Sequence, residues 1–188
     1  MSKPSFHHYR LELINPSFES PLVDLVTELD YLRKKRLFGT TKPFIFFQLK
    51  DLFHMLESIG SARIEGNNTT IAEYIETKLE DDDNKPSSIL EIENLEKAMD
   101  FIEDAVQEYP INKTFINELH KMVVENLPVT KDGEGDRTPG QYRKVNLTIN
   151  RSPHVPPDFT KVEEYMDELF DFINTVHPPK YDLLKTAL

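Results

Sequence analysis

Apolar residues recur along most of the chain at intervals of three and four, the spacing that places them on one face of an α-helix. Residues that favour helix starts precede most of these segments, and Ser or Thr three positions before Glu forms a capping box in three of them. The starts are Ser20-Pro21, Pro43, Thr70, Ser88, Asn112 and Thr160. We therefore expect a mostly helical protein, with its first helix ending at Gly39 and a break in the second at Gly60.

The period changes to two in a single stretch. Val145, Leu147 and Ile149 alternate with polar residues, which predicts a strand with one wet face. Residues 151–153 can turn the chain, so the sequence predicts a β-hairpin at about 144–156. A lone hairpin is marginally stable, so it has to lie on helices or offer its edge to another chain. The expected fold class is all-α, a helical bundle with one β-hairpin.

Composition excludes several classes of protein. The net charge of −11 argues against binding nucleic acid through its phosphates. No apolar run is long enough for a transmembrane helix, and the N-terminus lacks an apolar signal region. There is no cysteine, hence no disulfide and no thiolate metal site. We expect a cytoplasmic protein. The basic run 33–36 fits the last turn of a helix, and a docking patch is the alternative.

Residues that could carry chemistry are few. The sequence has no glycine-rich phosphate loop with a lysine and no pair of histidines at the spacing of a metal-binding helix, so no metal site is expected. His7 and His8 have no partner at ligand spacing, and we expect them to be solvated. His120 lies on or beside an apolar helix face, where a packed or exposed role is more common than a catalytic one.

Ser61 and Glu65 stand four residues apart, directly before Gly66. In a helix they lie one turn apart on the same face, and glycine is a common residue where a helix stops. A hydroxyl and a carboxylate placed in this way could reach into a neighbouring site. The spacing by itself is more typical of an ordinary helix end with a surface glutamate.

The surrounding residues resemble a known family. Ser61-Ala-Arg-Ile-Glu-Gly-Asn67 is similar to the inhibitory motif Ser/Thr-x-x-x-Glu-Gly/Asn of class II Fic (filamentation induced by cAMP) proteins. Thr138-Pro-Gly-Gln-Tyr-Arg143 resembles the Gly-x-aromatic-Arg segment that leads into the family's flap. The resemblance runs from about Phe46 to the end of the chain. The signature His-x-Phe-x-Asp/Glu-Gly-Asn-Gly-Arg-x-x-Arg is missing, because His177-Pro-Pro is not followed by it.

The resemblance implies an autoinhibited protein adenylyltransferase, which transfers AMP from ATP to a protein hydroxyl. Glu65 would pair with the last arginine of the signature and block the ATP γ-phosphate, Ser61 would orient the helix, and Gly66 would turn the backbone away. In the family the catalytic loop follows a segment like Tyr181–Leu188. We therefore expect a chain cut off before that loop, with no catalytic residue of its own. ATP and Mg²⁺ are expected for the complete protein and not as tight ligands of this chain.

The resemblance also implies an organisation and a partner. Residues 1–40 would be an N-terminal helical extension, 41–80 the inhibitory-helix region, and 81–188 the first part of the Fic domain. The flap would dock the protein substrate along its strand edge, with Gly140 and Arg143 at its base, and we expect Arg143 to fix that base rather than touch substrate. The docking residues would be Val145, Asn146, Leu147, Thr148, Ile149 and Asn150.

Several alternatives stay open. The chain could be a non-catalytic helical module that binds an extended peptide on the hairpin edge, or a helical scaffold with no ligand. A homodimer is compatible with the sequence, which does not say whether AMP is added or removed.

Overall fold

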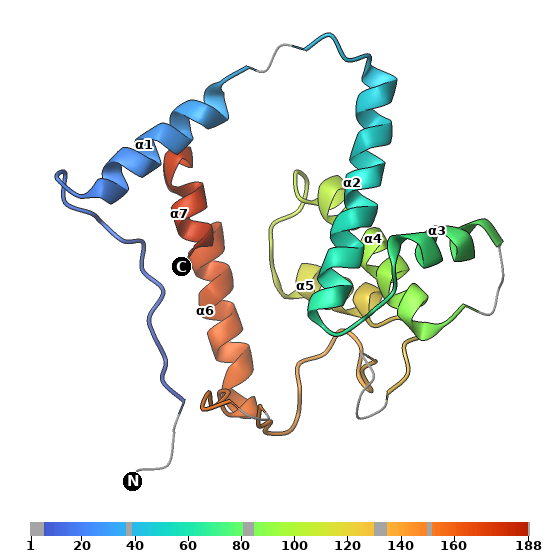
Figure 1. Ribbon diagram of the computed structural model, residues 1–188. Coiled ribbons are helices and arrows are strands. Elements are labelled where there is room, and N and C mark those ends of the chain that lie inside the picture. Colours follow the sequence, from blue (N-terminus) through green and yellow to red (C-terminus); the bar gives the residue numbers. More distant parts are fainter. Residues whose placement is uncertain (1–5, 37–38, 81–84, 130–134, 150–151, 188) are drawn as a thin grey trace. The chain divides into compact units, whose positions relative to one another are not determined.

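A computed structural model provides the structure of the protein and describes residues 6–36, 39–80, 85–129, 135–149 and 152–187 (Figure 1). Regular structure in these residues is entirely helical. The helices are α1 (Pro21–Lys34), α2 (Pro43–Ile64), α3 (Ile71–Glu80), α4 (Ser87–Ala105), α5 (Lys113–Val123), α6 (Val162–Asn174) and α7 (Asp182–Thr186), with 3-10 turns η1 (Phe159–Lys161) and η2 (Pro179–Tyr181).

The chain divides into two compact units. The central unit is Thr41–Gln141, and the terminal unit combines Met1–Thr40 with Tyr142–Leu188. None of the described helices combines the length and the apolar character that a helix needs to cross a bilayer.

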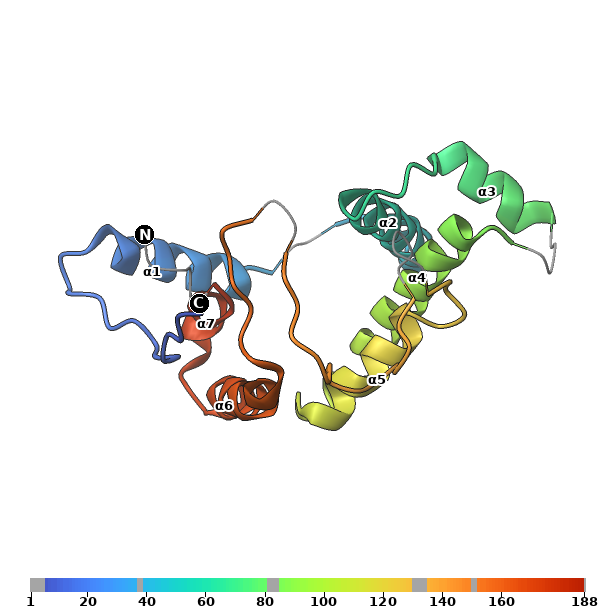
Figure 2. The same ribbon diagram turned by 90° about the horizontal axis from the view of Figure 1, so that it is seen from below.

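In the central unit, α4 packs against both α2 and α5 (Figure 1, Figure 2). Its core consists of buried residues from α2, α3 and α4, namely Ile59, Ala62, Tyr74, Ile89 and Ile92. Burying a large apolar side chain contributes about 1.5–3 kcal/mol, so this cluster is the main attachment of α2 and α3 to α4. The Tyr74 hydroxyl donates to Glu96 Oε2 at 2.9 Å, which satisfies its polar end. The core therefore lies against the last turns of α2.

Buried Asn94 joins α4 to the end of α5. Its Nδ2 group donates to the carbonyl oxygens of Val123 (3.2 Å) and Glu125 (2.8 Å). Carbonyls at the end of a helix have no partner within the helix, so Asn94 supplies one from a neighbouring element.

In the terminal unit, side chains connect segments that are far apart in sequence. Arg33 at the end of α1 donates to the Pro179 carbonyl (2.6 Å) and to Asp182 Oδ2 (2.8 Å). Lys185 donates to the carbonyls of Ile173 (2.5 Å) and Thr175 (2.7 Å), which closes the end of α6. The Arg33 side chain thus connects α1 to the start of α7, and the Lys185 side chain connects α7 to the end of α6.

The N-terminal segment lies along α6. His8 Nε2 is 2.8 Å from Glu168 Oε2, and the His8 ring stacks on Tyr165 with 4.3 Å between centroids. His7 contacts the Tyr9 ring edge-on at 4.4 Å. Both histidines are exposed, as expected, and His8 in addition has a partner that is distant in sequence.

Three predicted helix caps are confirmed. Ser20 Oγ accepts from the Leu22 N–H at 3.3 Å, and Asn112 Oδ1 accepts from the Phe115 N–H at 3.0 Å. At Thr70, the backbone N–H donates to Glu73 Oε2 (2.7 Å), and Thr70 Oγ1 accepts from the Glu73 N–H (3.2 Å), forming a capping box. Each of these caps forms between residues two or three positions apart in sequence.

The other two capping boxes are wrong, and so is one helix end. α4 begins at Ser87 behind Pro86 with no side-chain cap, and Glu91 accepts a hydrogen bond from Asn67 instead. Asp158, not Thr160, caps η1 by accepting from the Thr160 N–H at 3.0 Å. α1 ends at Lys34, before Gly39.

The expected break at Gly60 is also absent. α2 runs without interruption through Gly60 to Ile64. Glycine inside a helix costs about 1 kcal/mol relative to alanine. Burial of Ile59 and Ala62 on both sides of Gly60 offsets that cost.

The predicted β-hairpin at 144–156 is wrong. No strand occurs in the described residues, and residues 145–149 form no ladder with the residues that follow them. The return side offers few donors: Pro153, Pro156 and Pro157 lack an N–H, and the His154 N–H is bonded to Ser152 Oγ at 3.1 Å. The fold is therefore all-α in the part of the chain that the structure describes, and the apolar alternation lies in a loop.

Candidate functional site

The end of α2 carries the residues that the sequence singles out. The Gly66 N–H donates to the Arg63 carbonyl (3.1 Å) and the Asn67 N–H to the Ala62 carbonyl (3.0 Å). This pair of bonds is a Schellman motif, which closes a helix through a residue in the left-handed conformation. Gly66 has φ of +108°, where glycine has no steric cost. The helix therefore stops at a fixed point directly after Glu65.

Ser61 and Glu65 lie one turn apart at this end, and both are exposed. Ala62, the residue after Ser61, is fully buried against the core and fixes the face that the turn presents. Among the described residues, neither Ser61 nor Glu65 has a side-chain hydrogen bond or an ion pair. The Glu65 carboxylate is therefore attached to a well-defined backbone and remains available to a cationic partner.

Asn67 ties the same helix end to α4. Its Nδ2 group donates to the Ser88 carbonyl (2.7 Å) and to Glu91 Oε2 (2.8 Å), while its Oδ1 accepts from the Thr69 N–H (2.9 Å). Sequence reasoning placed Asn67 in the motif and gave it no role. The signal was its position directly after Gly66, but its partners are 21 and 24 residues away.

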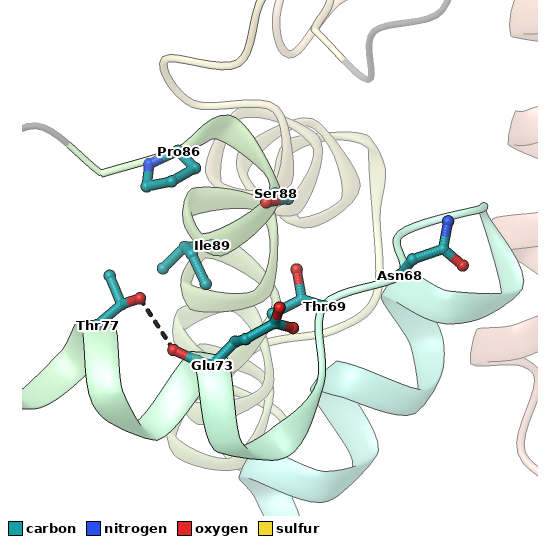
Figure 3. A pocket seen from close by; sticks show the side chains of 7 residues that line it. All are labelled: Asn68, Thr69, Glu73, Thr77, Pro86, Ser88 and Ile89. Carbon is teal, nitrogen blue, oxygen red and sulfur yellow. Dashed lines mark hydrogen bonds between the residues drawn. The ribbon is translucent and has the colours of Figure 1, made fainter.

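A pocket of about 490 Å³ lies beside this connection, between α3 and the first turn of α4 (Figure 3). Most of the described residues that line it carry a hydroxyl, amide or carboxylate, namely Asn68, Thr69, Glu73, Thr77 and Ser88, and they are joined by Pro86 and Ile89. The Thr70 backbone N–H and hydroxyl lower the pKa of Glu73, which keeps this carboxyl ionised. Lysine, arginine and histidine are absent from the described residues of the lining, so these residues do not suit a phosphate group.

The Thr138-Pro-Gly segment is fastened to α5. The Gly140 N–H donates to His120 Nδ1 at 2.9 Å, and His120 Nε2 lies 3.6 Å from Asp136 Oδ2. Gly140 has φ of +73°, and a Cβ there would come within 2.7 Å of Lys121 Cε and 2.9 Å of the Asn117 carbonyl oxygen. Both the positive φ and the lack of room for a Cβ thus require glycine at position 140. His120 holds the Thr138-Pro-Gly segment against α5.

Arg143 and Asn146 close the base of the loop that replaces the hairpin. The Arg143 guanidinium donates to the carbonyls of Val145 (2.8 Å) and Pro157. Asn146 Nδ2 donates to Asp158 Oδ2 (2.8 Å), and Asn146 Oδ1 accepts from the Phe159 N–H (2.8 Å). Hydrogen bonds from Thr160 and from Asn146 lower the pKa of Asp158 to about 2.

The expected docking residues therefore fall into two groups. Asn146 faces the loop base, whereas Val145, Leu147 and Ile149 are half or more exposed. Thr148 is exposed as well, and Asn150 lies outside the described residues. The structure places Gly140 in the central unit and Arg143 in the terminal unit.

No group of three or more histidine, aspartate or glutamate residues in the described ranges could hold a metal ion. No protein-family model matches the sequence, and no curated protein matches it either. The family resemblance therefore rests on residues 61–67 and 138–143 and on the segments that follow them.

Proposed function

We propose that this chain is the regulatory and target-docking part of an autoinhibited protein adenylyltransferase, with Glu65 as its inhibitory group. One observation carries the proposal. Glu65 is exposed and without an ion-pair partner among the described residues, at a helix end closed by Gly66, one turn beyond Ser61.

The physical argument is competition for an arginine. A carboxylate and a phosphate accept the same forked pair of N–H groups from a guanidinium, so only one of them can occupy a given arginine. In an enzyme that needs the arginine for the γ-phosphate of ATP, Glu65 in that position keeps the nucleotide from its productive pose. Replacing Glu65 therefore frees the arginine.

The described residues offer no group suited to the phosphates of ATP–Mg²⁺ in the pocket beside α3, because none of its described lining residues is cationic. The sequence also lacks a glycine-rich phosphate loop. The proposal therefore assigns nucleotide binding and catalysis to the family's signature loop, which this sequence does not contain.

For the target, we propose docking on the loop segment Val145–Ile149. Its apolar side chains are exposed at every second position, while Arg143 and Asn146 hold its base. Exposed apolar side chains of this kind can enter pockets on a partner's surface.

Calorimetric titration of ATP with Mg²⁺ tests where the nucleotide site lies. We expect binding by a form that continues past Leu188 into the signature and none by the 188-residue chain. Binding by the shorter chain would place the nucleotide among residues 1–188 and overturn the assignment. If neither form binds, a non-catalytic interaction module becomes the better description.

The inhibitory role of Glu65 is tested in the form that carries the signature. Glu65→Ala should raise incorporation of labelled AMP by about tenfold or more, because a charge-assisted hydrogen bond contributes about 1.5–3 kcal/mol. Glu57→Ala is the matched control, since Glu57 is an exposed carboxylate on the same helix without a side-chain partner in the described residues. Equal labelling of Glu65→Ala and the unsubstituted protein would refute the role.

A further inference from the structure

We propose that Asn67 is the positioning residue for the inhibitory carboxylate, acting by latching the end of α2 to the first turns of α4. The inference rests on the function proposed above for Glu65, and it assigns to Asn67 a role in regulation rather than in catalysis.

Both the amide nitrogen and the amide oxygen of Asn67 form hydrogen bonds. Its amide nitrogen reaches two acceptors on α4, the Ser88 carbonyl and the Glu91 carboxylate, at 2.7 and 2.8 Å. Its amide oxygen accepts from the Thr69 N–H at 2.9 Å. Figure 3 shows the connection from α2 to α3, with Asn68 and Thr69, running past Ser88 on α4. Three hydrogen bonds in different directions fix the plane of the amide relative to α4.

The backbone of Asn67 transmits this fixation to Glu65. Its N–H closes the Schellman motif on the Ala62 carbonyl at 3.0 Å, and only Gly66 separates it from Glu65. Between Ala62 and Gly66, the residues Arg63, Ile64 and Glu65 are all exposed, Ile64 by 84%. They contribute little burial that could hold the last turn in place, and unsupported helix ends fray. The Asn67 latch and the buried Ala62 are therefore what define where the Glu65 carboxylate points.

Because Glu91 accepts a hydrogen bond in the latch, the residue at position 67 has to carry an N–H donor and no negative charge. As a carboxylate it accepts a strong hydrogen bond from the neutral Asn67 amide. An aspartate at position 67 has nearly the same shape but no N–H to donate, and its charge would face that of Glu91. Asn67→Asp therefore removes the latch with almost no change in volume.

The decisive experiment is a double-mutant cycle in the protein that carries the signature loop, with incorporation of labelled AMP as the readout. We expect Asn67→Asp to raise labelling about fivefold, which corresponds to losing a net contribution of about one hydrogen bond. We also expect Asn67→Asp combined with Glu65→Ala to label no more than Glu65→Ala alone, because the latch acts only through Glu65. A residue that merely stabilises the fold would lower labelling in both backgrounds.

Each outcome decides a different point. No increase with Glu65→Ala overturns the proposed function and this inference with it. An increase with Glu65→Ala but none with Asn67→Asp overturns the latch alone. A further increase in the double variant also overturns it, because Asn67 would then act by another route.

Gln48→Glu is the matched control, because it makes the same amide-to-carboxylate change on the exposed part of α2, and it should leave labelling unchanged.

A second readout needs only the 188-residue chain. Asn67→Asp should speed hydrogen exchange at the Gly66 and Asn67 amides about fivefold while leaving buried Ile92 unchanged. Unchanged exchange at Gly66 and Asn67 would mean that the side chain does not hold this turn. Glu91→Ala removes one of the two acceptors on α4 and should give a smaller increase in labelling, which tests the latch if Asn67→Asp folds poorly.

Discussion

Gly60 inside α2 and Gly66 just after its end have different reasons to be glycine. At both positions an added Cβ would have no heavy atom within 4 Å, so steric room for a side chain is not what distinguishes the two glycines. Gly60 lies within the helix, whereas Gly66 has φ of +108°. A side chain is therefore compatible with the backbone at Gly60 and strained at Gly66.

The same substitution should have opposite effects at these positions. Gly60→Ala should raise the free energy of unfolding by about 0.5–1 kcal/mol, because alanine loses less backbone entropy in a helix. Gly66→Ala should lower it by about 1–2 kcal/mol, because the left-handed conformation is costly for a residue with a Cβ. Urea denaturation followed by circular dichroism measures both. Shifts of the same sign would contradict the assigned backbone conformations.

At the scale of elements, the loop after Arg143 shows why an alternating pattern is insufficient evidence for a strand. The alternation of Val145, Leu147 and Ile149 is real, but the chain that returns toward α6 is rich in proline and cannot complete a ladder. Side-chain bonds from Asn146 to Asp158 and Phe159 bring the two ends together instead.

Closure of this loop should depend on pH through Asp158. Its folded-state pKa is lowered to about 2, below its ordinary value of 3.8, so the ionised form stabilises the closed loop. The stabilisation is complete above about pH 4 and is lost as the pH falls toward 2. An NMR titration should give a midpoint near 2 for the Asp158 carboxyl and a linked shift of the Thr160 amide. In Asn146→Ala the midpoint should move up toward 3.8. A midpoint near 3.8 in the unsubstituted chain would mean that these bonds do not form in solution.

The helices and several of their starts could be predicted from sequence, because spacing of apolar residues and caps such as Ser20, Thr70 and Asn112 depend on neighbours within one turn. Errors arose where another residue took the place of the expected partner, Asn67 at Glu91 and Asp158 at Thr160. Glu91 could not be seen to bond Asn67, nor Asp158 to bond Asn146, because those partners meet only after folding. The spacing of Ser61, Glu65 and Gly66 is local and was readable, whereas the latch that holds it was not.

At the scale of the whole molecule, the two units are built in different ways. The terminal unit is discontinuous, since Arg33 on α1 bonds to Pro179 and Asp182 near the other end of the chain. The central unit is one continuous stretch, Thr41–Gln141, and it contains the buried cluster around Ile92. The candidate site needs only the central unit, because Ser61, Glu65, Asn67 and Glu91 all belong to it.

The central unit should therefore fold without the rest of the chain. Residues 41–141 expressed alone should show a helical spectrum and a cooperative thermal transition, because the contacts of Ile59, Tyr74 and Ile92 lie within them. Residues 142–188 alone should not, because α6 and α7 lose α1 and the Arg33 bonds. Ile92→Ala provides the control: loss of a fully buried side chain should lower the stability of the fragment by about 2–5 kcal/mol. A non-cooperative transition in 41–141 would mean that its core needs the terminal unit. A cooperative one would show that the end of α2, with Glu65 and its latch, is assembled by this stretch of sequence alone.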